Sequence, residues 1–168
     1  IVEGLKLLPG LINECLSEEN QIKRIAKRFK DKKSALFIGR GTMHAIAAEG
    51  ALKLKEISYI HAESYPAGEL KHGPIALIDE SMPVIAVAPN DELLSKLKSN
   101  LQEVKSRGSQ MIVFEDKDSK VRPMMAMEVV SITSNLGRIT APIIFTIPLQ
   151  LLSYHVALIK GTDVDKPR

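Results

Sequence analysis

The feature that most constrains the fold of this chain is a series of short apolar blocks separated by stretches with helical spacing. The blocks occupy residues 35–38, 83–89, 110–114 and 129–133, and the last three are rich in β-branched side chains. Such blocks are typical of strands buried on both faces. The alternation predicts an α/β fold: a three-layer, doubly wound, mainly parallel sheet with helices on both faces. In this architecture ligands bind beyond the carboxyl ends of the strands.

Helix boundaries are predicted from capping residues and breakers. Asn90 and Asp91 precede an apolar stripe that ends at Gly108, so a helix is expected between them. Thr42 can cap the helix that follows the first strand. The pair at 9–10, Pro-Gly, is expected to break the first apolar segment, and Ser17 to cap a leading helix.

Composition excludes several classes of protein. The chain has 168 residues, a size typical of one domain, and its net charge of +3 is spread along the sequence, which disfavours nucleic-acid binding. Cys15 is the only cysteine, which excludes an intrachain disulfide and fits a reducing cytoplasm. Residues 1–10 lack the pattern of a secretory signal. The apolar stretch at 139–159 contains prolines and polar residues, so we expect a buried helix and no membrane span.

The turn after the first predicted strand carries glycines. Gly39 and Gly41 are followed by His44 where a dinucleotide-binding motif needs a third glycine, so a nicotinamide cofactor is disfavoured. The loop could still offer amide groups to an anion at the start of the next helix. A plain tight turn explains the same glycines and is the favoured interpretation.

Three charged residues share one face of the next predicted helix. Glu49, Lys53 and Glu56 stand at i, i+4 and i+7. Without further context this pattern indicates a solvated ladder of ion pairs. The rest of the helix is largely apolar, however, so the charged face can instead border a crevice, where burial would raise the pKa of a carboxyl group.

Of the four histidines, His72 has the most promising context. It lies between the breakers Pro66, Gly68, Gly73 and Pro74, in a loop where a group that titrates near neutral pH suits acid–base chemistry. A solvent-facing side chain is the alternative. His61 and His155 sit in apolar surroundings, and we expect structural roles for both.

Three strings carry a family resemblance. They are EGALKLKEISYIHAESYPAGELKHGP at 49–74, its continuation IALID, and VALIKGTDVDKPR at the end of the chain. They resemble the second sugar isomerase (SIS) subdomain of the glucosamine-6-phosphate synthase family. The resemblance implies flavodoxin-like topology, a connecting helical segment at 1–30 and the SIS domain at 31–168. In that family a first SIS subdomain and an N-terminal glutaminase domain precede this part.

The resemblance also implies a function and assigns residues to it. The family converts fructose 6-phosphate and glutamine-derived ammonia to glucosamine 6-phosphate, the first step of hexosamine biosynthesis, without a metal or organic cofactor. Glu56 would be the base that moves a proton between C1 and C2 of the sugar, Lys53 would stabilise the enediolate oxygens, and Glu49 would support them. His72 would open the sugar ring in the site of the partner subunit of a homodimer.

Two parts of the family pattern are missing between residues 1 and 168. One is the serine- and threonine-rich loop that holds the sugar phosphate. The other is the lysine that forms a Schiff base with the ketose, a position that neither Lys160 nor Lys166 matches. We therefore expect the isolated chain to have little or no synthase activity. A regulatory module that binds sugar phosphates and a dimerisation scaffold are the alternative functions.

Overall fold

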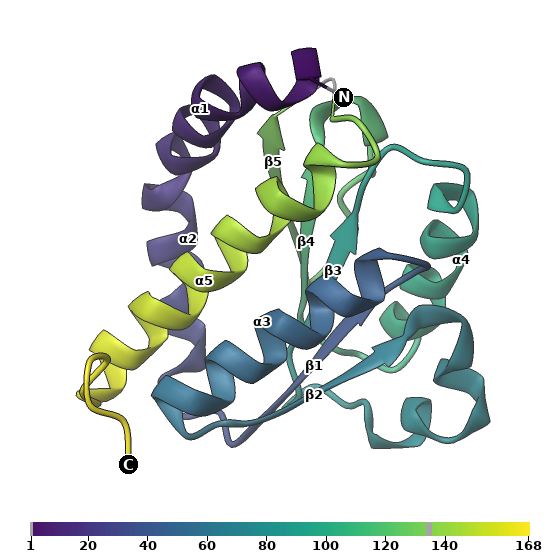
Figure 1. Cartoon of the computed structure of the whole chain (residues 1–168). Helices are drawn as coiled ribbons and strands as arrows, with labels where there is room; N and C mark the ends of the chain where they lie inside the picture. Colours follow the sequence, from purple (N-terminus) through teal and green to yellow (C-terminus); the bar gives the residue numbers. More distant parts are fainter. Residues whose placement is uncertain (1, 134–135) are drawn as a thin grey trace.

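The computed structural model describes residues 2–133 and 136–168 and contains a five-stranded sheet (Figure 1). Its strand order is β2-β1-β3-β4-β5, and every neighbouring pair is parallel. The four expected strands are confirmed, and β2 is an additional edge strand. The strands are β1 (Ser34–Gly39), β2 (His61–Pro66), β3 (Val84–Ala88), β4 (Met111–Asp116) and β5 (Met127–Thr133).

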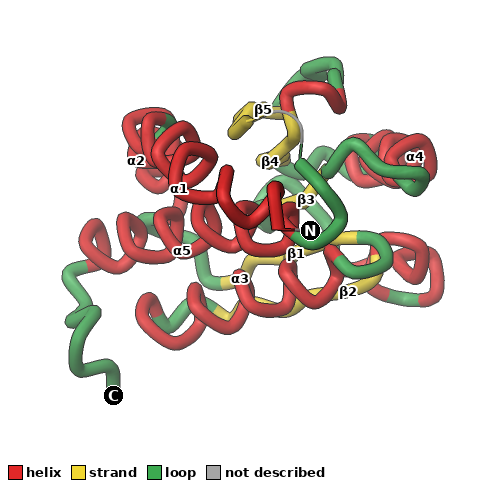
Figure 2. Tube along the Cα trace, turned by 45° about the horizontal axis from the view of Figure 1, so that its top comes forward, coloured by secondary structure: helices red, strands yellow, loops and turns green. Residues whose placement is uncertain are grey.

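Helices cover both faces of the sheet, which confirms the expected doubly wound, three-layer architecture (Figure 2). One face carries four helices: α1 (Val2–Ser17), α2 (Glu19–Ala26), α3 (Met43–Ser58) and α5 (Thr140–Lys160). The other face carries α4 (Leu94–Lys105) and η2, a 3₁₀ segment at Ala67–His72. The remaining 3₁₀ turns are η1 (Lys27–Phe29), η3 (Pro74–Leu77) and η4 (Lys117–Ser119).

Alternate side chains of the strands pack into two separate hydrophobic cores, one on each face of the sheet. In β1, Phe37 packs into the cluster shared with α2, α3 and α5, whereas Leu36 and Ile38 pack into the cluster beneath α4 and η2. Both faces of the central strands are therefore apolar, which explains why their sequences are continuous apolar blocks. The strand order 2-1-3-4-5 is that of flavodoxin-like folds and places its switch point between β1 and β3.

The first helix corrects one expectation from the sequence. α1 runs through Pro9 and Gly10 without a break. Its apolar residues Leu8, Leu11 and Ile12 pack against the core cluster on α5, and Cys15 is fully buried there. This packing outweighs the low helix propensity of the Pro-Gly pair.

Three predicted caps also need correction. Ser17 ends α1 and its hydroxyl donates to the Glu14 carbonyl, while α2 begins after Glu18. Thr42 does precede α3, but its side chain makes no capping hydrogen bond. α4 begins only at Leu94, and the Asp91 carboxylate accepts a hydrogen bond from the amide of Leu93 in the preceding turn.

The long apolar helix α5 is the expected buried helix. By length and composition alone it could cross a membrane. However, half of the 18-residue stretch that passes this test is buried within the protein. It packs against α3, α2 and α1 and includes Pro148. His155, only 4% exposed, lies with its Nε2 3.0 Å from Glu19 Oε1 and so joins α5 to α2. This confirms the structural role expected for His155.

Candidate functional site

The three charged residues predicted on one helix face lie together on α3. Lys53 donates a hydrogen bond of 2.7 Å from Nζ to Oε2 of Glu56, one turn further along the helix. This bond raises the pKa of Lys53, and the negative charges of Glu56 and Glu49 raise it further. Lys53 therefore remains an ammonium ion at neutral pH and supplies a fixed positive charge beside the Glu56 carboxylate.

Within this chain the charged face is open to solvent. The side chains of Lys53 and Glu56 are 35% and 42% exposed, and Glu49 is half-buried. The buried side of α3 is formed by other residues, among them Ala47, Ala51 and Leu54. The described part of this chain therefore does not form the expected crevice around Lys53 and Glu56. A second surface is needed to exclude water from these two side chains.

His72 is held in a different part of the fold. It ends η2, its side chain is 75% exposed, and its Nε2 lies 3.8 Å from Oε2 of Glu69. His61, for which a structural role was expected, is instead exposed at the start of β2, 3.4 Å from Glu63. Both imidazoles therefore face solvent beside a carboxylate of their own segment.

Glu56 and His72 are not brought together in one chain. Because β1, α3 and β2 form a parallel crossover, α3 ends near the amino end of β2, and Glu56 lies in its last turn (Figure 1). His72 follows the carboxyl end of β2. The strand between them has six residues and spans about 20 Å. If both residues serve one reaction, they must serve it in different copies of the site.

The largest described cavity, about 690 Å³, lies where the switch-point rule places ligands. Its walls come from the segments that follow β1, β3 and β5: residues 41–43, 89–93, 136–139 and 141. It contains the start of α3 and the charged side chains of Asp91, Glu92 and Arg138. The crevice expected beyond the carboxyl ends of the strands is therefore present.

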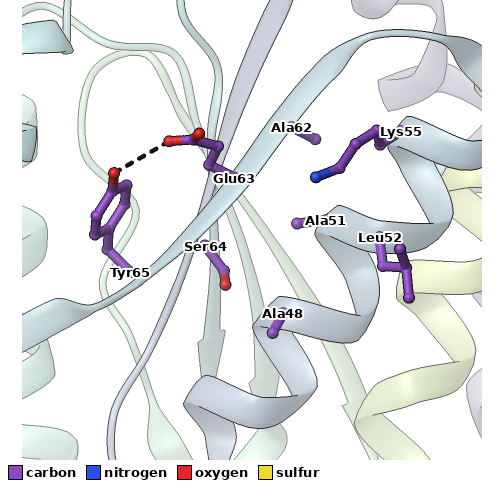
Figure 3. A pocket seen from close by; sticks show the side chains of 8 residues that line it. All are labelled: Ala48, Ala51, Leu52, Lys55, Ala62, Glu63, Ser64 and Tyr65. Atoms are coloured by element: carbon purple, nitrogen blue, oxygen red, sulfur yellow. Dashed lines mark hydrogen bonds between the residues drawn. The ribbon is translucent and has the colours of Figure 1, made fainter.

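A smaller cavity of about 320 Å³ lies between α3 and the edge strand β2 (Figure 3). Ala48, Ala51 and Lys55 line it from α3. On β2, Ala62 and Ser64 lie on the side of α3, whereas the side chains of Glu63 and Tyr65 lie on the opposite side of the strand (Figure 3). There the hydroxyl of Tyr65 donates a 3.1 Å hydrogen bond to Glu63, and this bond raises the pKa of Tyr65. The sequence analysis missed this cavity and the polar pair behind it because β2 was not predicted as a strand.

A metal centre is not formed by the described part of the chain. Across residues 2–133 and 136–168, no group of three or more His, Cys, Asp or Glu side chains is arranged to hold an ion. The chemistry available at α3 is that of a carboxylate and an ammonium group: proton transfer and stabilisation of a developing oxyanion.

Comparison with known proteins identifies the family. The SIS domain family matches residues 28–160. Over all 168 residues the chain is 58% identical to glutamine-fructose-6-phosphate aminotransferase (isomerizing) of Pectobacterium atrosepticum and 59% identical to the Escherichia coli K12 enzyme of the same name. It spans 27% of the length of each.

A solved structure agrees with this assignment. The C-terminal domain of glucosamine-fructose-6-phosphate aminotransferase from Francisella tularensis superimposes with a TM-score of 0.94 at 55% sequence identity. The match covers 98% of this chain and 46% of that one. From the matched family, the relatives and the shared fold, we conclude that the chain belongs to the SIS domain family.

Proposed function

We propose that this chain is the second SIS subdomain of an isomerising glutamine:fructose-6-phosphate amidotransferase, as part of a longer protein. The observation that carries the proposal is the identity of 58–59% to such enzymes over the whole chain. The paired Lys53 and Glu56 on α3 support it with suitable chemistry. The sugar substrate is fructose 6-phosphate and the product is glucosamine 6-phosphate. We place the SIS domain at 31–168 and treat residues 1–30 as the connecting helical segment.

Glu56 is the proposed base. Ammonia first condenses with the C2 carbonyl of the open sugar, and the carbonyl oxygen leaves as water. The Glu56 carboxylate then removes a proton from C1 and returns it to C2, so that C1 is oxidised from an alcohol to an aldehyde and C2 is reduced from an imine to an amine with no external reductant. The electron pair left at C1 forms a C1–C2 double bond, and negative charge develops on the C1 oxygen as its hydroxyl group loses a proton. Lys53, kept protonated by its hydrogen bond to Glu56, stabilises that charge. Glu49 adds a second carboxylate that keeps the ammonium ion charged.

A complete site needs other parts of the protein. The open charged face of α3 requires a cover, which we assign to the first SIS subdomain together with its phosphate-binding loop. The glutaminase domain supplies ammonia. His72 lies at the opposite end of β2 from Glu56, so we assign its ring-opening role to the site of the partner subunit in a homodimer. The reaction belongs in the cytoplasm, where a free, buried Cys15 stays reduced.

Mixed dimers test this assignment directly. Glu56→Gln and His72→Ala subunits of the complete synthase are each expected to be inactive as homodimers. In a heterodimer one site loses both groups, while the other combines Glu56 of one subunit with His72 of its partner. Random pairing therefore restores about a quarter of wild-type activity. No recovery in purified heterodimers would show that His72 does not act across the interface.

A sugar-phosphate-binding regulatory module is the second candidate, and the 690 Å³ cavity at the strand ends favours it. The two functions differ in how they respond to Glu56→Gln. A catalytic base is required for proton exchange and contributes little to sugar affinity, so the variant should bind fructose 6-phosphate and fail to exchange it. A sensor would lose affinity or lose nothing.

A further inference from the structure

A continuous set of polar contacts joins the end of β1 to the 3₁₀ segment that carries His72. Arg40 follows β1 and donates a 2.8 Å hydrogen bond from Nη1 to Oδ1 of Asn100 on α4. Asn100 is only 8% exposed and donates from Nδ2 to Glu103 Oε2 at 3.4 Å. Glu103 Oε1 lies 2.9 Å from Nζ of Lys71, the residue before His72.

Arg40 also packs directly against the start of η2. A Cβ atom at Gly68 would lie 3.1 Å from Nη1 and 3.3 Å from Nη2 of Arg40. The guanidinium group therefore lies close to the Gly68 backbone, and a side chain at this position would require it to shift. Arg40, hydrogen-bonded to Asn100, contacts the first part of η2, and Lys71, in the last part of η2, is paired with Glu103.

His72 itself has few contacts to fix its position. Its side chain is 75% exposed, and its 3.8 Å approach to Glu69 is longer than a hydrogen bond. The next residue, Gly73, has a φ of 141° and open space around its α-carbon. The imidazole is thus placed by the segment that carries it, whose Leu70 is fully buried in the core beneath α4.

We propose that Arg40, Asn100, Glu103 and Lys71 are positioning residues for His72. This inference rests on the proposed role of His72 in the partner subunit's site and deepens it. None of the four residues is required to touch the sugar. Their contacts set the orientation of η2. This orientation places the exposed imidazole of His72 within proton-transfer distance of the ring oxygen of the sugar bound in the partner subunit's site.

The test uses the heterodimer in which a single site is active. One subunit carries Glu56→Gln and donates His72, and the other carries His72→Ala and donates Glu56. Lys71→Met is then added to either subunit. In the His72-donating subunit it should lower kcat roughly tenfold or more with KM unchanged, because a misplaced acid–base group slows only the chemical step. In the Glu56-donating subunit it should change nothing.

Two further variants complete the experiment. Asn100→Leu, similar in size, interrupts the contacts at their buried centre and should show the same dependence on which subunit carries it. Lys105→Met removes an exposed cation from the same helix and should have no effect in either subunit. Equal losses from Lys71→Met in both subunits, or no loss in either, would overturn the positioning role. An inactive parent heterodimer would instead contradict the proposed function of His72.

Discussion

Lys53 Nζ lies 2.7 Å from Glu56 Oε2, and this hydrogen bond is the largest cause of the raised pKa of Lys53. Glu49 contributes the smallest of the effects that raise it. Glu56→Gln should therefore lower the pKa of Lys53 clearly, and Glu49→Gln should lower it less. NMR titration of the Lys53 side chain in protein with labelled lysine measures both changes.

The ordering of the two variants is the decisive result. An equal decrease for Glu49→Gln and Glu56→Gln would mean that the charge of the helix face, and not the hydrogen bond, keeps Lys53 protonated. In that case Glu56 would not be coupled to the ammonium ion as the proposed mechanism requires.

Gly50 is predicted to be indispensable for the packing of α3. A Cβ atom there would lie 2.8 Å from Leu149 Cδ1 on α5 and 3.0 Å from Phe37 Cε1 on β1, inside the main core. Gly50→Ala should lower the free energy of unfolding by about 1 to 2 kcal/mol, since overpacking outweighs the better helix propensity of alanine. Urea denaturation measures the loss.

Gly10→Ala is the matched control. Gly10 also lies inside a helix, but nothing is within 4 Å of an added Cβ. The substitution should raise the free energy of unfolding by up to about 1 kcal/mol through helix propensity alone. Stabilisation by both variants would show that the contact between α3 and α5 is looser than described.

Cys15 should make stability depend on pH in alkaline solution. Burial raises the pKa of its thiol from 9.0 to about 12. Between these values the unfolded chain releases the proton and the native protein keeps it. The contribution of the thiol to stability is therefore complete below pH 9 and is lost, at no more than about 1.4 kcal/mol per pH unit, as the pH rises.

Cys15→Ala isolates this effect from the titration of lysines and tyrosines. The difference in unfolding free energy between wild type and variant should shrink as the pH rises from 9 to 11. Alkylation of Cys15 by iodoacetamide should likewise require unfolding, because the side chain is fully buried. Rapid alkylation of the native protein would contradict the burial of α1 against α5.

The central strands could be predicted from sequence because each is apolar on both faces. The edge strand β2 could not, since only one of its residues is fully buried and its sequence, HAESYP, is mostly polar. Pairing with β1 defines it as a strand, and that contact is distant in the sequence. The path of α1 through Pro9 and Gly10 is also determined by tertiary packing, against α5, and not by local propensity.

The candidate site shows the same division. The common face of Glu49, Lys53 and Glu56 follows from helical spacing and was predictable. The openness of that face and the distance between Glu56 and His72 depend on the crossover, which sequence spacing does not describe. The contact of Arg40 with Asn100 joins residues 60 positions apart and had no local signal beyond an arginine between two glycines.

The central claim is that Glu56 is the base, within a site that this chain alone does not complete. Exchange of deuterium from solvent into C1 of fructose 6-phosphate tests both parts, with the isolated chain, the complete isomerase and its Glu56→Gln variant compared by NMR. We predict exchange by the wild-type complete isomerase only. Exchange by the Glu56→Gln variant would contradict the role of Glu56, and exchange by the isolated chain would contradict the need for a shared site.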